Sequence, residues 1–156
     1  DVCITTDTQT GTRALWRSDR LRKLFLTFAE PGQVGLSSIG SLISPTTRED
    51  NNGLVIDIDP TAKQFKKLMA PIAPGLFEPV AITNYEPISI NQKCVLDNSV
   101  GTLAYDGERE VTVFSGDRIE IALDRRGPRT IDMTKTIENI AHSGLLINDD
   151  TLQSGR

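Results

Sequence analysis

The residues best placed to do chemistry start at Gly35, which is followed after Leu36 by Ser37 and Ser38. Either serine is expected to cap a short helix near residues 37–44, which ends before Pro45. The first turn of a helix offers backbone N–H groups without partners and the positive end of the helix dipole. Such a turn suits an anion or a ribose hydroxyl, but pattern alone favours an ordinary cap beside a closely packed glycine.

Three other polar groups have both a chemical and a structural interpretation. Asp106-Gly107 is either a functional acid in a tight turn or a β-hairpin turn. Asp57 and Asp59 share one face of an expected strand, so they either chelate a cation or face solvent. The arginines within 125–129 form either a polyanion site or a solvated turn. Pattern alone favours the structural interpretation for Asp106-Gly107 and for the arginines, whereas for Asp57 and Asp59 it supports both interpretations equally.

Histidine and cysteine are too few for a structural zinc site, and no spacing of metal ligands occurs. His142, the single histidine, lies near the end of the last expected helix, where the dipole favours a cation. It is expected to have a surface or capping role. Cys3 and Cys94 are expected to be buried thiols in a reducing cytoplasm, and a disulfide between them is the alternative.

Chain length and net charge narrow the possible classes of protein further. A chain of 156 residues has the size of one domain, and a net charge of −4 argues against a partner made of nucleic acid. No apolar run reaches the ~20 residues that cross a bilayer, so a cytoplasmic protein is expected. The chain opens with Asp1 directly before a strand-like run, which suggests that sequence is missing upstream.

Short β-branched runs separated by Gly, Asp and Pro indicate a mainly β fold, similar to a sandwich or a barrel. A final helix is expected near 133–143, where Asp132 or Thr134 caps it, Gly144 stops it, and its apolar side closes the fold. A polar tail, 148–156, follows. The expected strands are 2–6, 21–29, 54–59, 68–72, 79–85, 88–90, 93–96, 102–105, 110–114 and 118–123, with 130–133 as an optional last strand.

Three segments together resemble the NAD kinases of the ATP-NAD kinase superfamily. Residues 35–45 are similar to their Gly-Ser-Thr-Ala-Tyr stretch, 69–76 to their Thr-Pro-Ile-Cys-Pro stretch, and 105–108 to their late Asp-Gly-Gln turn. The fit is closer still to the ATP-NAD-kinase-like proteins associated with acetoin catabolism. Further segments that resemble this subgroup are 11–16, 29–31, 103–110 and 127–129.

This resemblance implies the C-terminal β domain of a two-domain enzyme, which residues 1–147 would form. The N-terminal α/β domain would carry a Gly-Gly-Asp-Gly loop with the catalytic aspartate, and that sequence is absent here. The implied function is binding of an NAD-like nucleotide for an ATP-dependent phosphotransferase that uses ATP and Mg²⁺. The implied partners are the protein's own N-terminal domain and further copies in a homo-oligomer, with no membrane and no nucleic acid.

The resemblance also implies the residues that bind the substrate. Asp1 would correspond to the acid that reaches a ribose hydroxyl. Ile39 or its neighbour stands where the family has a tyrosine, so an aromatic stacking contact is expected to be lost, and NAD itself becomes doubtful as the substrate. No catalytic residue and no metal ligand is implied for this chain. The implied binding residues are Asp1, Gly35, Ser37, Ser38, Ile39 and Asp106.

Two other functions remain open at this point. The first is a regulatory or nucleotide-sensing module, linked to acetoin catabolism, that performs no turnover; the missing tyrosine motivates it. The second is a relative of lipid or sugar kinases, which share the two-domain plan.

Overall fold

The structure is a computed structural model that describes residues 1–6, 17–97, 100–105, 109–127, 129 and 131–147. The chain divides into two compact units, Asp1–Arg125 and Arg126–Arg156, and each is described by itself. None of the described helices is long and apolar enough to cross a membrane. Whether 1–147 forms one domain stays a prediction.

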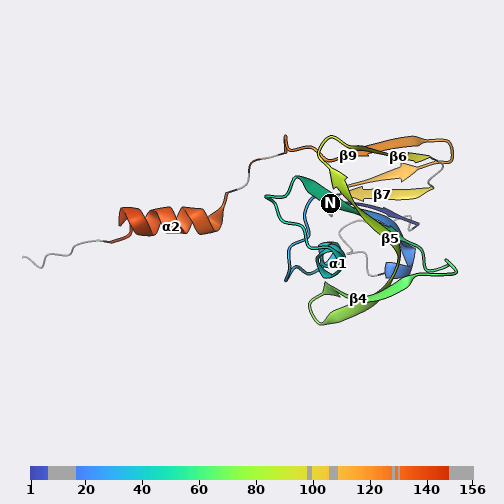
Figure 1. Cartoon of the computed structure of the whole chain (residues 1–156), viewed down its shortest axis with the longest axis horizontal. Helices are drawn as coiled ribbons and strands as arrows, with labels where there is room; N and C mark the ends of the chain where they lie inside the picture. Colours follow the sequence, from blue (N-terminus) through green and yellow to red (C-terminus); the bar gives the residue numbers. More distant parts are fainter. Residues whose placement is uncertain (7–16, 98–99, 106–108, 128, 130, 148–156) are drawn as a thin grey trace, which may run out of the picture. The chain divides into compact units, whose positions relative to one another are not determined.

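The fold is mainly β with two described helices, as the sequence predicts (Figure 1). In chain order the described elements are β1 (Val2–Thr5), the 3-10 helix η1 (Ser18–Arg20), β2 (Leu21–Leu26), α1 (Leu36–Ile43), β3 (Asn52–Ile58), β4 (Lys66–Ala73), β5 (Leu76–Ser89), β6 (Lys93–Asp97), β7 (Gly101–Tyr105), β8 (Arg109–Val113), β9 (Arg118–Ala122) and α2 (Met133–Ser143).

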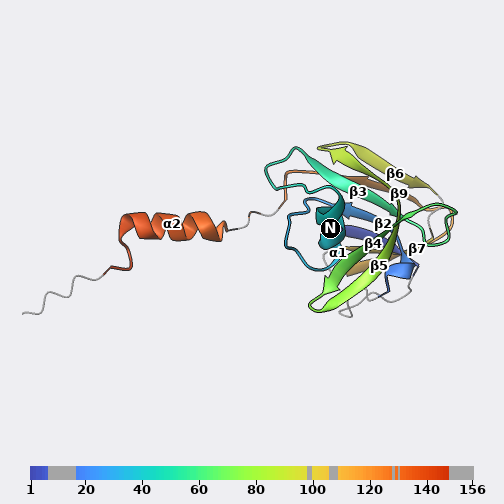
Figure 2. The ribbon, with the colours of Figure 1, turned by 60° about the horizontal axis from the view of Figure 1, so that its bottom comes forward.

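Most of the strands form one antiparallel sheet in the order β4-β5-β3-β2-β1-β7-β8, and β6 pairs with β9 in a second sheet. β5 joins two halves of the large sheet, because it pairs with β4 from Leu76 to Ile82 and with β3 from Ile82 to Ser89. This change of partner lets the sheet curl around α1, as Figure 1 shows. Figure 2 shows the β4–β5 hairpin running past the same helix.

The sequence predicts a break within β5, at the Glu-Pro pair before Ile88, but the strand is continuous. Each half of β5 has one open edge, because β4 and β3 pair with different halves. Open edges are where a sheet tolerates a residue without an N–H group. Pro79 and Pro87, one in each half, are therefore compatible with a single strand.

Both faces of the large sheet are covered. Successive residues of β3 therefore belong to two different buried clusters. Leu54, Ile56 and Ile58 of β3 belong to the buried cluster that contains Ile39 of α1. Val55 belongs to the opposite cluster, against which residues of β6 and β9 pack. The large sheet thus lies between α1 and the second sheet, and the predicted alternation of residues 54–58 is confirmed.

The β7–β8 hairpin is confirmed by strand pairing from Gly101↔Val113 to Tyr105↔Arg109, although the turn at Asp106 lies outside the described residues. The optional strand at 130–133 is wrong in its described part. Asp132 accepts a hydrogen bond from the Lys135 backbone N–H at 3.0 Å, and this contact starts α2 instead. The same bond lowers the pKa of the Asp132 carboxyl.

The second unit contains α2, whose bounds Met133–Ser143 match the prediction. Gly144, with a φ of 64°, ends the helix in the left-handed conformation, and His142 lies in the last turn, as predicted. No residue of α2 is buried. The role of its apolar side in closing the fold stays a prediction.

At Gly40, α1 packs closely against the sheet. A Cβ there would overlap the Leu26 side chain and lie 2.8 Å from the Ala29 Cβ. We expect Gly40→Ala to lower the free energy of unfolding by about 1–3 kcal/mol in urea denaturation, because the core must shift to admit a methyl group.

Gly127→Ala is the matched control, because a Cβ at Gly127 would have no neighbour within 4 Å. Its effect should stay within about 0.5 kcal/mol. A stabilising Gly40→Ala, which is the usual effect of this change inside a helix, would show that the close packing is wrong.

Candidate functional site

The start of α1 is tied to the backbone of β4. Gly35 is the residue before the helix and has a φ of 96° and a ψ of −158°, a conformation essentially restricted to glycine. Its N–H donates to the Pro71 carbonyl at 3.0 Å. No side chain caps the helix, so the prediction that Ser37 or Ser38 is the cap is wrong.

Ser38 instead stabilises this turn through hydrogen bonds in the protein interior. Its side chain is 1% exposed, and its hydroxyl lies 2.6 Å from the Gly35 carbonyl and 3.2 Å from the Pro71 carbonyl. Ile39 is 0% exposed and belongs to the core. The binding roles predicted for Ser38 and Ile39 stay predictions, and in this structure their side chains have almost no surface with which to contact a ligand.

Ser37 points the other way, to the first residue of the chain. Its hydroxyl donates to the Asp1 carboxylate at 2.7 Å, and both residues have solvent exposure. The positive end of the helix dipole favours a carboxylate at this place. Of the six predicted binding residues, the structure thus brings Asp1, Ser37 and Gly35 together at one end of α1.

A small pocket of about 70 Å³ lies beside Asp1. Ligand pockets are usually roughly 300–1,000 Å³, so this one cannot enclose a nucleoside by itself. Apart from Asp1 and Thr27, its lining is apolar and comes from β1, β2, β5 and β9, with Leu123 after it: Val2, Phe25, Leu26, Ile88, Ile121, Ala122 and Leu123. The pocket is therefore too small to be a complete nucleotide site.

Two of the segments that carry the family resemblance are in contact. The helix start at Gly35 and the segment 69–76 meet through Pro71, whose carbonyl accepts from both Gly35 and Ser38. This contact could not be predicted from the sequence, because the two segments are far apart in the chain and neither contains a pattern that points to the other. In the third segment, residues 106–108, which include Asp106, lie outside the described residues.

The remaining predicted acids serve local structure. The Asp57 carboxylate pairs with the Lys23 ammonium at 2.5 Å. The Asp59 carboxylate accepts from the backbone and the hydroxyl of Thr61 at 2.8 and 2.6 Å, which lowers its pKa. Within the part of the chain that the structure describes, no group of three or more His, Cys, Asp or Glu side chains could hold a metal ion.

The two thiols are free. Burial raises the pKa of Cys3 to about 11, so its thiol stays protonated and unreactive at neutral pH. Cys94 is half-buried rather than buried. In the last predicted cluster, Arg125 donates to the Asp50 carbonyl and to the Asn51 side chain, so it has a structural contact.

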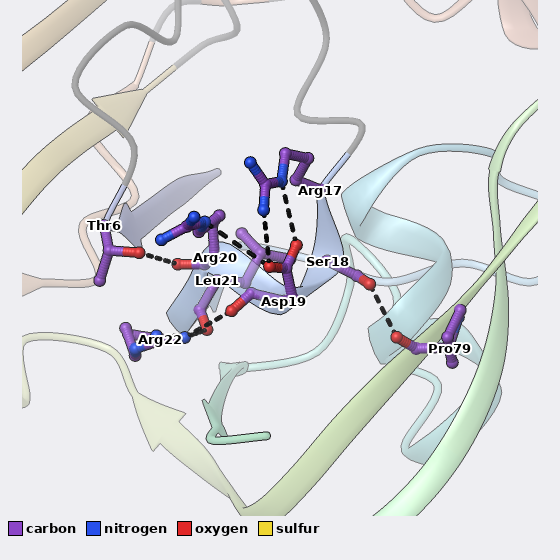
Figure 3. A network of polar contacts seen from close by, with 8 residues as sticks. All are labelled: Thr6, Arg17, Ser18, Asp19, Arg20, Leu21, Arg22 and Pro79. Carbon is purple, nitrogen blue, oxygen red and sulfur yellow. Dashed lines mark hydrogen bonds and ion pairs between the residues drawn. The ribbon is translucent and has the colours of Figure 1, made fainter. Parts of the chain in front are cut away.

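A polar network at η1 escaped the sequence reasoning (Figure 3). The Arg17 guanidinium donates to both oxygens of the Asp19 carboxylate, at 3.3 and 3.0 Å, and this holds the pKa of Asp19 below its usual range. Arg20 and Arg22 lie against the same turn. The available signal in the sequence was the close spacing of Arg17, Arg20 and Arg22 around the start of β2.

This network lies away from the start of α1. Leu21 pairs with Thr5 at one end of β1 and β2, whereas Phe25 pairs with Val2 at the other end, next to Asp1. The Arg17 and Asp19 side chains are also 57% and 55% exposed. Ion pairs this exposed contribute about 0–1 kcal/mol, so we attribute a local ordering role to the network.

Comparison with known proteins identifies similarity to one family. The family model for the acetoin catabolism protein X C-terminal domain matches residues 1–126. Acetoin catabolism protein X of Cupriavidus necator is 31% identical over 146 residues, which are 94% of this chain and 41% of that protein. The chain thus spans about two fifths of the length of this relative. No solved structure matches.

The contrast between the two serines gives a stability prediction. Ser38→Ala removes a buried donor to two backbone carbonyls and should lower the free energy of unfolding by about 1–3 kcal/mol. Ser37→Ala removes a contact at the surface and should change it by less than about 1 kcal/mol. Thermal and urea denaturation of both variants measure this, and equal losses would contradict the assignment of Ser38 to structure and Ser37 to the surface.

Proposed function

This chain belongs to the acetoin catabolism protein X C-terminal domain family, and on that premise we propose that it binds the ribose of an NAD-like dinucleotide for an ATP-dependent phosphotransferase. The observation that carries the proposal is the contact between the Ser37 hydroxyl and the Asp1 carboxylate at the start of α1. The resemblance of residues 35–45 and 69–76 to NAD kinases supports it.

The charge at this helix start favours a ribose over a phosphate. The dipole of a helix is equivalent to roughly half a positive charge at its N-terminus, whereas the Asp1 carboxylate carries a full negative charge. A phosphate would therefore be repelled, while a pair of ribose hydroxyls can donate to the two carboxylate oxygens. Ser37 both donates and accepts, so it can complete the hydrogen bonding of one hydroxyl.

In this proposal, the phosphates of ATP and the metal ion bind outside this chain. The described residues give no ligand set for Mg²⁺, and we derive no step through it. The N-terminal α/β domain would hold ATP, and a ribose hydroxyl oxygen would attack the γ-phosphorus, with release of ADP and a proton. Residues of this chain would only hold and orient that hydroxyl, which is how phosphoryl transfer is mainly catalysed.

The proposal also covers the metabolic process, the cellular compartment and the oligomeric state of the whole protein. The printed name of the relative links that protein to acetoin catabolism, and we assign this chain to the same process. We further propose a cytoplasmic homo-oligomer in which each copy joins this domain to its own N-terminal domain.

One observation favours a second function, the sensing of a nucleotide without turnover. Ile39 takes the place of the family's tyrosine or lies next to it, and it is 0% exposed in the core. It cannot stack on a nucleobase, and such stacking contributes about 1–3 kcal/mol per base in other sites. A weaker, reversible contact would suit a sensor.

The decisive experiment is an assay of the full-length protein with ATP, Mg²⁺ and NAD. We expect ATP-dependent phosphorylation of NAD or of a related acceptor, and we expect Ser37→Ala to lower kcat/KM by about tenfold, because one hydrogen bond to the ribose is lost. Ser115→Ala, in the exposed turn between β8 and β9, is the matched control and should retain full activity.

The outcomes separate the two functions. NAD binding measured by calorimetry, without NADP formation, would favour the sensor. Neither binding nor turnover with NAD or related acceptors would leave the family assignment and the fold but remove the nucleotide proposal.

A further inference from the structure

The apolar lining of the pocket beside Asp1 has no role in the ribose site proposed above. The pocket lies within the first compact unit, where the buried cluster between the two sheets comes close to the start of β1. The lining residues that belong to this cluster or pack against it are Val2, Phe25, Ile88, Ile121 and Leu123. The pocket is therefore a gap in the core with one charged residue, Asp1, in its lining.

The volume of the pocket limits the chemical group that it admits. A dry apolar cavity of about 150 Å³ binds benzene, and this pocket, at about 70 Å³, has roughly half that volume. A methyl, ethyl or acetyl group fits, whereas a nucleobase, which is larger than benzene, does not. The apolar lining also disfavours a phosphate or a carboxylate, because burial of an unpaired charge is costly.

The two polar residues of the lining define the rest of the ligand. A carboxylate has about four acceptor positions, and Ser37 donates to Asp1 at 2.7 Å, so a ligand hydroxyl can donate to another position. Thr27 also lines the pocket, and a threonine hydroxyl can donate to a ligand carbonyl. A compound with a hydroxyl next to a carbonyl can use both residues while its short alkyl end fills the apolar part.

We propose that this pocket binds a small α-hydroxyketone, whose hydroxyl donates to the Asp1 carboxylate and whose methyl end lies between Phe25 and Ile121. This inference rests on the proposed function, because the hydroxyketone and the ribose use the same carboxylate and therefore compete. Acetoin, which the proposed process consumes, belongs to this class, since it has a hydroxyl next to a carbonyl and a methyl group on each side. The pocket thus lowers nucleotide binding when this compound accumulates.

The test is binding of acetoin to the full-length protein without nucleotide, measured by saturation-transfer NMR of the acetoin methyl groups. A ligand this small is expected to have a Kd in roughly the millimolar range, which this measurement detects. Butanone is the matched control ligand, because it keeps the carbonyl and the alkyl groups but lacks the hydroxyl. We expect butanone to bind about tenfold more weakly, because it cannot donate to the Asp1 carboxylate.

Variants of the protein locate the bound acetoin. Asp1→Asn removes the charge but keeps the size of the side chain, and it should weaken acetoin binding by about tenfold. Ala122 lines the pocket and is exposed, so Ala122→Leu should reduce the free volume and weaken acetoin binding by roughly fivefold or more. Ser115→Leu, in the exposed turn between β8 and β9, is the matched control and should leave acetoin binding unchanged.

A second readout is competition between acetoin and NAD. Calorimetry of the full-length protein measures the apparent Kd for NAD at increasing acetoin concentrations. The apparent Kd should rise about twofold when the acetoin concentration equals its own Kd, and it should continue to rise in proportion. The same concentrations of butanone should change the apparent Kd for NAD much less.

Several results would overturn the inference: no binding of acetoin, equal binding of acetoin and butanone, unchanged binding in Asp1→Asn and Ala122→Leu, or NAD binding that saturating acetoin does not weaken. The binding of acetoin is measured without a nucleotide, so the two proposals can fail separately. A protein that binds NAD but not acetoin would refute this inference alone. A protein that binds acetoin with the expected variant effects, but neither binds nor phosphorylates NAD or a related acceptor, would refute the proposed function alone.

Discussion

The start of α1 depends on one backbone acceptor, the Pro71 carbonyl. It accepts from the Gly35 N–H at 3.0 Å and from the Ser38 hydroxyl at 3.2 Å, so it joins the helix to the edge strand β4. These bonds, together with the packing of Gly40 against Leu26 and Ala29, hold α1 inside the curl of the sheet. Because these contacts fix the position of α1, the Ser37 side chain points to Asp1.

Because of the hydrogen bonds to Pro71, two neighbouring serines have different roles. Ser38 uses its hydroxyl inside the protein, whereas Ser37 presents its hydroxyl to the Asp1 carboxylate at the surface. A carboxylate at a helix start is itself stabilised by the dipole and disfavours a second anion. The pocket beside Asp1, at about 70 Å³, is too small for a whole nucleotide. We therefore propose a partial site for ribose hydroxyls that another region completes.

Local patterns predicted much of the fold, and long-range contacts explain what they missed. The alternation around Ile56 and the Asp132 and Gly144 caps depend on neighbouring residues, so the sequence was sufficient for β3 and α2. The continuity of β5 through Pro87 depends on which strands pair with each half, and no local pattern encodes that. The same limit applies to the helix start, where Ser38 was predicted to be a cap but is held inward by Pro71. The contact between Asp1 and Ser37 was not predicted, although the family resemblance implied that both bind the substrate.

The central claim, that the Asp1 carboxylate binds a ribose diol, is tested most directly by calorimetry of the full-length protein and its Asp1→Asn variant. The ligands are NAD and analogues that lack both hydroxyls of one ribose, made for each ribose in turn. The account predicts that the unmodified protein prefers NAD over one analogue by roughly tenfold or more, and that Asp1→Asn removes this preference. A preference of the same size in both proteins would contradict it.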